Sequence, residues 1–152
     1  MIYAHKHYKI IIEDNVLNLF KNFKQTGRKH ERGGILLGEV SSKEIRIKRA
    51  SIPTVFDSSS RFSFNRNKKS AQIITDYEYN NSNGKIIYLG EWHTHPEKKP
   101  SPSSIDCKMI SNQFRKNKIN EWFLLMIIVG LDDMYVSFYD GKSNTELKKI
   151  TN

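Results

Sequence analysis

The residues with the clearest chemical potential in this chain of 152 residues are two histidines and one aspartate. His93 and His95 are separated by a single residue, and Asp106 follows eleven residues after the second histidine. Imidazole nitrogens and a carboxylate oxygen are typical ligands of Zn²⁺, and a zinc ion with three protein ligands keeps its fourth position for water. The spacing therefore indicates a catalytic metal site. A structural zinc site usually has four ligands that include cysteines.

A strand followed by a helix is required to position these ligands. Residues i and i+2 share a face only on a strand, and the segment 85–92 before His93 is rich in β-branched and aromatic residues, as strands are. Pro96 ends regular pairing because it has no N–H. After a polar loop, Ser101 or Ser103 can cap a helix with Asp106 in or near its first turn. We expect these elements to bring the three ligands within bonding distance of one ion.

A simpler interpretation exists for each part of this pattern. A His-x-His pair is often two exposed residues of a strand. Ser103 and Asp106 also fit the Ser-x-x-acid pattern that caps a helix without any further role. Capping explains the serine and the aspartate but leaves the paired histidines unexplained, so we favour the metal site.

With these residues in view, the chain resembles the JAMM (Jab/MPN) metallopeptidases. The signature of that family is an upstream glutamate, then His-x-His, seven residues, Ser, two residues and Asp. The likeness extends from about residue 14 to the C-terminal strands, and the stretch 31–38 also resembles the glutamate-led strand of the family. The positions that match the signature are Glu31, His93, His95, Ser103 and Asp106.

The resemblance implies a role for each of these residues. His93, His95 and Asp106 would bind zinc, and Glu31 would hold the attacking water, take its proton and pass it to the leaving amine. Ser103 would donate a hydrogen bond to the tetrahedral oxyanion. The residue types suit this chemistry, because Zn²⁺ can lower the pKa of a water from 15.7 to about 7 and can polarise a carbonyl.

Two neighbours of the ligands need a separate interpretation. Glu91 competes with Glu31 as the base because it is closer in sequence to the histidines. It lies two residues before His93 on the same face of the strand, roughly 6–7 Å away, so we interpret it as a residue that supports the ligands or the fold. Cys107, the only cysteine, is expected to be a small buried apolar residue. A single cysteine excludes a disulfide framework and is typical of the reducing cytoplasm, where we expect this protein.

The balance of charge favours acidic partners, because Lys and Arg number 25 and Asp and Glu 16, which gives a net charge of +9. The segment 61–69 mixes phenylalanines with basic residues, as surfaces that stack bases do. We favour a loop with buried phenylalanines, and we do not expect nucleic acid as a partner because no nucleic-acid motif is present. Neither a signal peptide nor a membrane span is expected, since the apolar run 122–129 is too short for a bilayer.

The order of elements predicts one α/β domain over residues 1–152, with a mixed central sheet flanked by about three helices. We expect strands at 8–12, 35–40, 44–52, 85–95, 122–129 and 134–139, and an edge strand at 145–150. Helices are expected at 70–79 and 103–117, and another from Asp14 as the N-cap to Gly27 as the C-cap. The JAMM likeness implies the same architecture, a cytidine-deaminase-like core. Deaminase chemistry is not expected, because His-x-Glu and Pro-Cys-x-x-Cys are missing.

The function that the resemblance implies is that of a zinc-dependent isopeptidase or peptidase. Such an enzyme removes a ubiquitin-like or otherwise conjugated protein at its C-terminal tail, so its partner is a protein substrate. The short chain is most similar to bacterial members, some of which are encoded in anti-phage operons beside conjugation enzymes and cyclic-nucleotide synthases. Two alternatives stay open: a peptidase that processes a ubiquitin-like sulfur-carrier protein, and a non-catalytic MPN scaffold.

Overall fold

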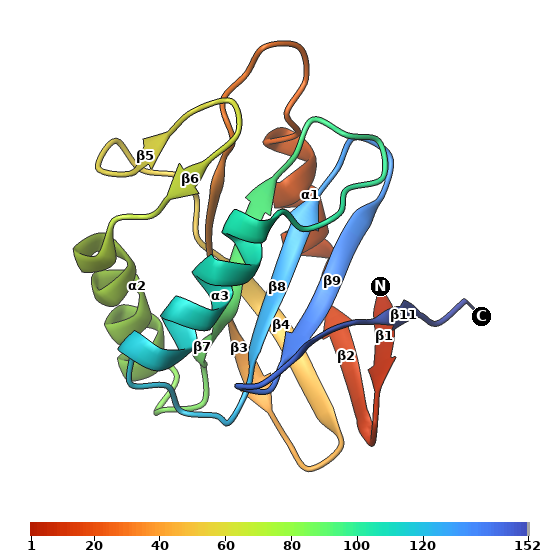
Figure 1. Ribbon diagram of the computed structural model, residues 1–152. Helices are drawn as coiled ribbons and strands as arrows, with labels where there is room; N and C mark the ends of the chain where they lie inside the picture. The colour runs from red at the N-terminus through yellow and green to blue at the C-terminus, as the bar shows by residue number, and fades with distance from the viewer. Residues whose placement is uncertain (152) are drawn as a thin grey trace.

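The computed structural model describes residues 1–151 and arranges nine of their strands in one mixed sheet (Figure 1). The strand order is β10-β9-β8-β7-β3-β4-β2-β1-β11. The pairs β2–β4 and β7–β8 are parallel and the other neighbours are antiparallel. These strands are β1 (Ile2–His5), β2 (Tyr8–Ile12), β3 (Gly33–Val40), β4 (Glu44–Ala50), β7 (Ile87–Thr94), β8 (Leu124–Val129), β9 (Met134–Tyr139), β10 (Asn144–Glu146) and β11 (Lys148–Lys149).

Three helices and a small hairpin complete the described residues, so the prediction of a mixed sheet with about three helices is confirmed. The hairpin pairs β5 (Ser58–Ser59) with β6 (Phe64–Asn65) and stands apart from the main sheet (Figure 1). The helices are α1 (Asp14–Asn22), α2 (Lys68–Asn81) and α3 (Ser104–Lys116). No helix within residues 1–151 combines the length and the apolar character needed to cross a membrane.

The sheet curls until its two edges meet at one segment. Residues 144–146 pair with β9 at one edge, and residues 148–149 pair with β1 at the other. Between them, the N–H of Leu147 donates to the carbonyl of Val136. The rings of His5 and Phe138 stack across this seam with their centroids 4.3 Å apart. The edge strand expected at 145–150 is therefore two short strands, one added to each edge of the sheet.

Alternation along the central strand β8 divides the apolar interior into two cores. Leu125 and Ile127 belong to the core that packs against α1, whereas Leu124 and Met126 belong to the core covered by α2 and α3. Successive side chains of a strand point to opposite faces, and a strand covered on both faces reads as a continuous apolar run. The interpretation of 122–129 as a central strand is confirmed, although the strand itself begins at Leu124.

The first helix differs from the prediction at both ends. Glu13 occupies the N-cap, so Asp14 is the first helical residue, and the helix ends at Asn22 with Phe23 as its C-cap. The predicted end at Gly27 is wrong, although Gly27 does adopt a positive φ of 63° in the loop beyond. The segment after the helix makes other contacts, since Nζ of Lys24 donates to the carbonyl of Leu131 at 2.6 Å.

Two burial predictions are also wrong. Cys107 is exposed, because α3 turns Asp106 and Ile110 toward the interior and Cys107 follows about 100° further around the helix. Phe62 is 70% exposed at the turn between β5 and β6, and Phe64 is only half-buried, so the segment 61–69 does not bury its phenylalanines as a pair. The strand β1 and the β5–β6 hairpin were not predicted.

Candidate metal centre

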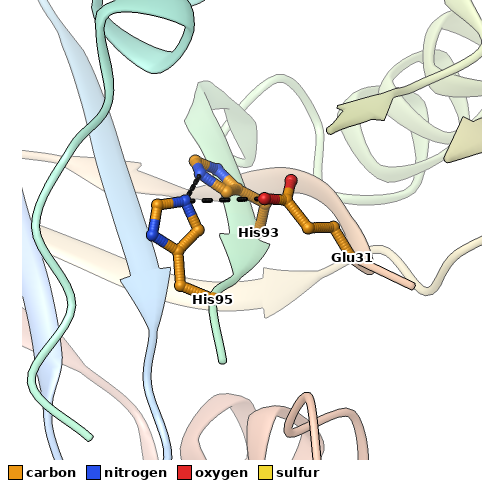
Figure 2. Close-up of side chains that lie close together, drawn as sticks. All are labelled: Glu31, His93 and His95. Carbon is orange, nitrogen blue, oxygen red and sulfur yellow. Dashed lines mark hydrogen bonds and ion pairs between the residues drawn. The ribbon is translucent and has the colours of Figure 1, made fainter. Parts of the chain in front are cut away.

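The two histidines lie at the C-terminal end of a fully buried central strand, with His93 in β7 and His95 just beyond it. Strand β7 pairs with β3 on one side and β8 on the other, and each of its residues is buried. His93 and His95 point to the same side, and their Nε2 atoms are 3.2 Å apart (Figure 2). Both side chains are almost fully buried, so the strand presents two imidazoles at a fixed spacing.

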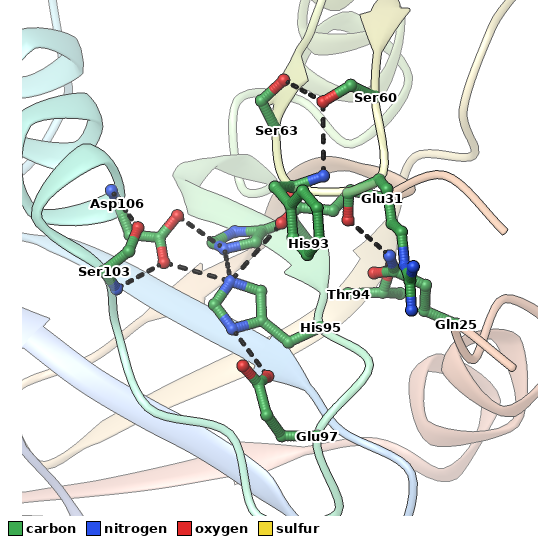
Figure 3. Close-up of polar contacts among 12 residues, drawn as sticks. Gln25, Glu31, Ser60, Ser63, His93, Thr94, His95, Glu97, Ser103 and Asp106 are labelled. Atoms are coloured by element: carbon green, nitrogen blue, oxygen red, sulfur yellow. Dashed lines mark hydrogen bonds and ion pairs between the residues drawn. The ribbon is translucent and has the colours of Figure 1, made fainter. Parts of the chain in front are cut away.

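Asp106 reaches the same point from the first turn of α3. Its Oδ1 lies 3.0 Å from His93 Nε2 and its Oδ2 lies 3.1 Å from His95 Nε2 (Figure 3). The backbone N–H of Ser103 donates to Asp106 Oδ2 at 2.8 Å, and the N–H of Asp106 donates to Ser103 Oγ at 3.1 Å. This capping box holds the carboxylate toward the histidines. Capping and convergence on the histidines therefore occur together and are not alternatives.

The donor atoms have the spacing that a small divalent cation requires. Ligands bound at 2.0–2.1 Å around a tetrahedral zinc-sized ion stand about 3.3 Å from one another. The two Nε2 atoms are 3.2 Å apart, and each faces one oxygen of Asp106, with Oδ1 at 3.0 Å from His93 and Oδ2 at 3.1 Å from His95. Within residues 1–151, neither Asp106 nor Glu31 forms an ion pair with a lysine or an arginine. The cluster thus combines converging donors with carboxylates that no lysine or arginine balances, which fits a metal cation.

Glu31 completes the cluster from the loop that precedes β3. Its Oε1 lies 3.7 Å from His95 Nε2, and one ligand atom each of Glu31, His93 and His95 lie within 4.8 Å of one another (Figure 2). The side chain is buried, and burial raises the pKa of Glu31 to about 7. The charge of His95 opposes this increase, whereas the charges of Asp106 and Glu97 add to it. A carboxyl group of this kind can exchange a proton near neutral pH.

Glu97 is a neighbour of the site that the sequence pattern did not indicate. One of its carboxylate oxygens lies 3.2 Å from Nδ1 of His95, on the side of the ring that faces away from the cluster (Figure 3). This contact is an ion pair, and within residues 1–151 Nδ1 of His95 makes no hydrogen bond. Burial lowers the pKa of His95, but the hydrogen bond to Asp106 and the charges of Asp106, Glu31 and Glu97 outweigh it, so the pKa is raised above 6.5.

Glu91 is held by a different set of partners, two residues before His93. Nε of Arg66 donates to both its carboxylate oxygens, at 2.8 and 3.0 Å, and the hydroxyl of Tyr88 donates to Oε1 at 2.6 Å. Nη2 of Arg66 donates a hydrogen bond to Oε1 of Gln113 on α3 at 2.9 Å. The carboxylate of Glu91 is therefore already paired with a cation and hydrogen-bonded at both oxygens, as a structural residue would be. The sequence contained no spacing that could have identified Arg66 as its partner.

A small cavity adjoins the cluster. It has a volume of about 90 Å³, and its walls include Phe64 of the hairpin and Met109 of α3, together with Glu31, His93 and Asp106.

A comparison with protein-family models assigns the chain to a family. The family described as prokaryotic homologs of the JAB domain matches residues 14–140, and the chain belongs to it. The predicted JAMM (Jab/MPN) resemblance is confirmed.

Three curated relatives share the name CD-NTase/cGAS isopeptidase. The one from Pseudomonas aeruginosa is 33% identical over 139 residues, which cover 85% of this chain and 87% of the relative. The Escherichia coli relative is 32% identical over 142 residues, covering 93% and 86%. The Vibrio cholerae relative is 32% identical over 120 residues, covering 79% and 74%.

A solved structure supports the fold independently. The solution structure of a protein from Desulfitobacterium hafniense aligns with a TM-score of 0.64 and covers 90% of this chain and 88% of its own. The two sequences are 15% identical, so this likeness concerns the fold alone.

Proposed function

We propose that this protein is a zinc-dependent isopeptidase that releases a protein joined through its C-terminal tail to a CD-NTase, within an anti-phage system. The observation that carries the proposal is the convergence of His93, His95 and Asp106 on one point beside the buried carboxyl of Glu31. The shared name of the three curated relatives supports the substrate class and favours this activity over sulfur-carrier processing. The full donor set argues against a non-catalytic scaffold.

Zinc is the metal that the donor set suits best. Two imidazole nitrogens and one carboxylate oxygen are the ligands of catalytic zinc sites, where a fourth position stays open. His93, His95 and Asp106 would hold the ion. When bound, Zn²⁺ supplies Lewis acidity that polarises the scissile carbonyl and acidifies water.

Glu31 is the proposed acid–base residue. Its carboxylate accepts the proton of the attacking water and then donates it to the leaving lysine amine as the isopeptide C–N bond breaks. Proton transfer by a well-placed carboxylate is typically worth about 10²- to 10⁴-fold in rate. Burial and a position 3.7 Å from His95 Nε2 support this role.

Ser103 is the proposed donor to the tetrahedral oxyanion. Its Oγ accepts the N–H of Asp106, so the hydroxyl proton stays available for donation. A donor that meets the oxyanion is worth about 3–4 kcal/mol in comparable hydrolases. The capping box fixes the distance between this hydroxyl and Asp106.

The test is cleavage of a defined conjugate. A CD-NTase joined by an isopeptide bond to a ubiquitin-like protein is incubated with the zinc-loaded protein, and the products are identified by intact mass. We expect release of both free proteins, a loss of about 10²-fold or more in Glu31→Gln, and no cleavage after chelation. Glu91→Gln serves as the matched carboxylate control and is expected to stay far more active. Retained zinc with activity abolished only in Glu91→Gln would reverse the assignment of the base.

A further inference from the structure

Two buried polar side chains beside the metal centre have no part in the proposed chemistry. Gln25 is 1% exposed and Thr94 is fully buried. Burial of such groups is costly unless each polar atom is paired. Their partners lie on the segments that surround Glu31 (Figure 3).

Thr94 stands between the two histidines and points to the opposite side of the strand. Its Oγ1 accepts the backbone N–H of Arg32 at 2.9 Å, and its own N–H donates to the carbonyl of Arg32 at 2.8 Å. The residue that follows Glu31 is thus attached to the strand that carries both histidines. The hydroxyl also donates to Oε1 of Gln25 at 3.3 Å.

Gln25 extends these contacts to the hairpin. Its Nε2 donates to the carbonyl of Arg61 at 2.7 Å and to the carbonyl of Lys29 at 3.0 Å. A further bond of 2.8 Å from the N–H of Glu31 to the carbonyl of Ser60 joins the same two segments. One side chain therefore connects the loop before β3, the β5–β6 hairpin and, through Thr94, strand β7.

Glu31 depends on these contacts because it belongs to neither a helix nor a strand. A loop residue has no regular ladder of hydrogen bonds to fix its backbone, and catalytic groups require placement within about 0.5 Å. The bonds made by Thr94, Gln25 and Ser60 take the place of that ladder.

We propose that Gln25 and Thr94 form a clamp that positions the carboxylate of Glu31 relative to His93, His95 and Asp106. The inference rests on the proposed function, in which Glu31 transfers the proton. Both are positioning residues and touch neither substrate nor metal. A purely structural pair would support folding alone and would leave the turnover of the folded protein unchanged.

The first variant is Thr94→Val, which keeps the shape of the side chain but removes the hydroxyl. Thr94→Ser restores the hydroxyl, and Thr75→Val is the matched control because Thr75 Oγ1 donates only to the carbonyl of Ala71 within α2. In the metal-free protein, hydrogen exchange of the segment 26–32 is expected to quicken at least tenfold in Thr94→Val and to stay unchanged in Thr75→Val.

With zinc bound, kcat of Thr94→Val is expected to fall about 10- to 100-fold, as it does when residues that orient a metal site are lost. Bound zinc and KM should stay close to those of the wild type, and Thr94→Ser should recover most of kcat. In a Glu31→Gln background, Thr94→Val should cause no further loss, because residues that act through the same group are non-additive.

The outcomes separate this inference from the proposed function. If Thr94→Val keeps the wild-type kcat while Glu31→Gln is inactive, the clamp alone is overturned. The clamp alone is also overturned if Thr94→Val lowers kcat by the same factor in the wild type and in the Glu31→Gln background. Wild-type kcat in Glu31→Gln overturns both. If Thr94→Val does not fold, Gln25→Met tests the same contacts at a position remote from the histidines, and unchanged exchange and kcat in that variant overturn the clamp.

Discussion

Two clusters of buried carboxylates adjoin strand β7, one around Glu91 and the other around His93, two residues later. They differ in how the charge of the carboxylates is balanced. Around Glu91, the guanidinium of Arg66 and the hydroxyl of Tyr88 satisfy the carboxylate from within the chain. Around His93 and His95, the ion-pair partners of Asp106 and Glu31 are imidazoles, and no lysine or arginine within residues 1–151 pairs with either carboxylate. The carboxylate of the first cluster is paired with a cation of the chain itself, and the second cluster has the charge and geometry of a site that can hold an additional cation.

The difference shows why proximity in sequence is a poor guide to catalytic role. Glu91 is closer to the histidines along the chain, yet its oxygens are occupied by Arg66 and Tyr88. Glu31 is 62 residues before His93 and still reaches the cluster, because β3 pairs antiparallel with β7 and begins beside its end. A carboxylate without a cationic partner in the chain is available for proton transfer, whereas one bound to a guanidinium and a hydroxyl contributes mainly to structure.

The largest expected effect comes from breaking the cluster around Glu91. In Arg66→Met, the buried Glu91 loses its cation, and removal of one partner of a buried ion pair typically costs about 3–5 kcal/mol. The free energy of unfolding, measured by urea denaturation, is expected to fall by that amount. The double variant Arg66→Met, Glu91→Gln is expected to recover much of this loss. Because the loss of Arg66 favours the protonated form of Glu91, the deficit should shrink as pH falls. An unchanged free energy of unfolding would show that the pair is not the source of stability.

The sequence predicts the local half of this arrangement well. Alternation on β7 is sufficient to place His93 and His95 on one face, and the Ser-x-x-Asp pattern is sufficient to place Asp106 at a helix start. Both inferences need only the geometry of one strand and one helix. For the same reason the apolar run that contains β8 could be recognised as a central strand.

The contacts between residues far apart in the sequence could not be predicted from spacing. Gln25 meets Thr94 across 69 residues and Arg66 meets Glu91 across 25, and no local pattern links such pairs. The closure of the sheet by residues 144–149 is also invisible locally, because it depends on the curl of the whole sheet. One signal was available: the middle residue of a His-x-His pair faces away from the metal, so a threonine there indicates a polar partner on the opposite side.

A smaller effect on stability is expected when zinc binds to the cluster of His93, His95 and Asp106. Zinc that binds only the folded state stabilises it by about 2.7 kcal/mol when the free ion is at 100 times its dissociation constant. Asp106→Asn should lose most of this gain, because the carboxylate contacts both histidines. Glu91→Gln should keep it, since its cluster is separate. Thermal unfolding with and without zinc provides the measurement, and equal gains in wild type and Asp106→Asn would contradict the proposed ligand set.

The smallest effect is the dependence of zinc affinity on pH. A histidine must be neutral to bind a metal, and the pKa of His95 is raised above 6.5 because its hydrogen bond to Asp106 and the surrounding carboxylates outweigh its burial. Apparent affinity should therefore fall about tenfold for each pH unit below that raised pKa and level off above it. Because Glu97 is among the charges that raise the pKa of His95, Glu97→Gln should shift the midpoint of the curve toward lower pH. Competition with a chelating dye between pH 5.5 and 8.5 measures both curves. An affinity that did not change across this range would mean that protons and zinc do not compete for this cluster, and the contrast with the self-neutralised Glu91 would no longer hold. A midpoint that moved upward in Glu97→Gln would contradict the contribution of Glu97 to the raised pKa of His95.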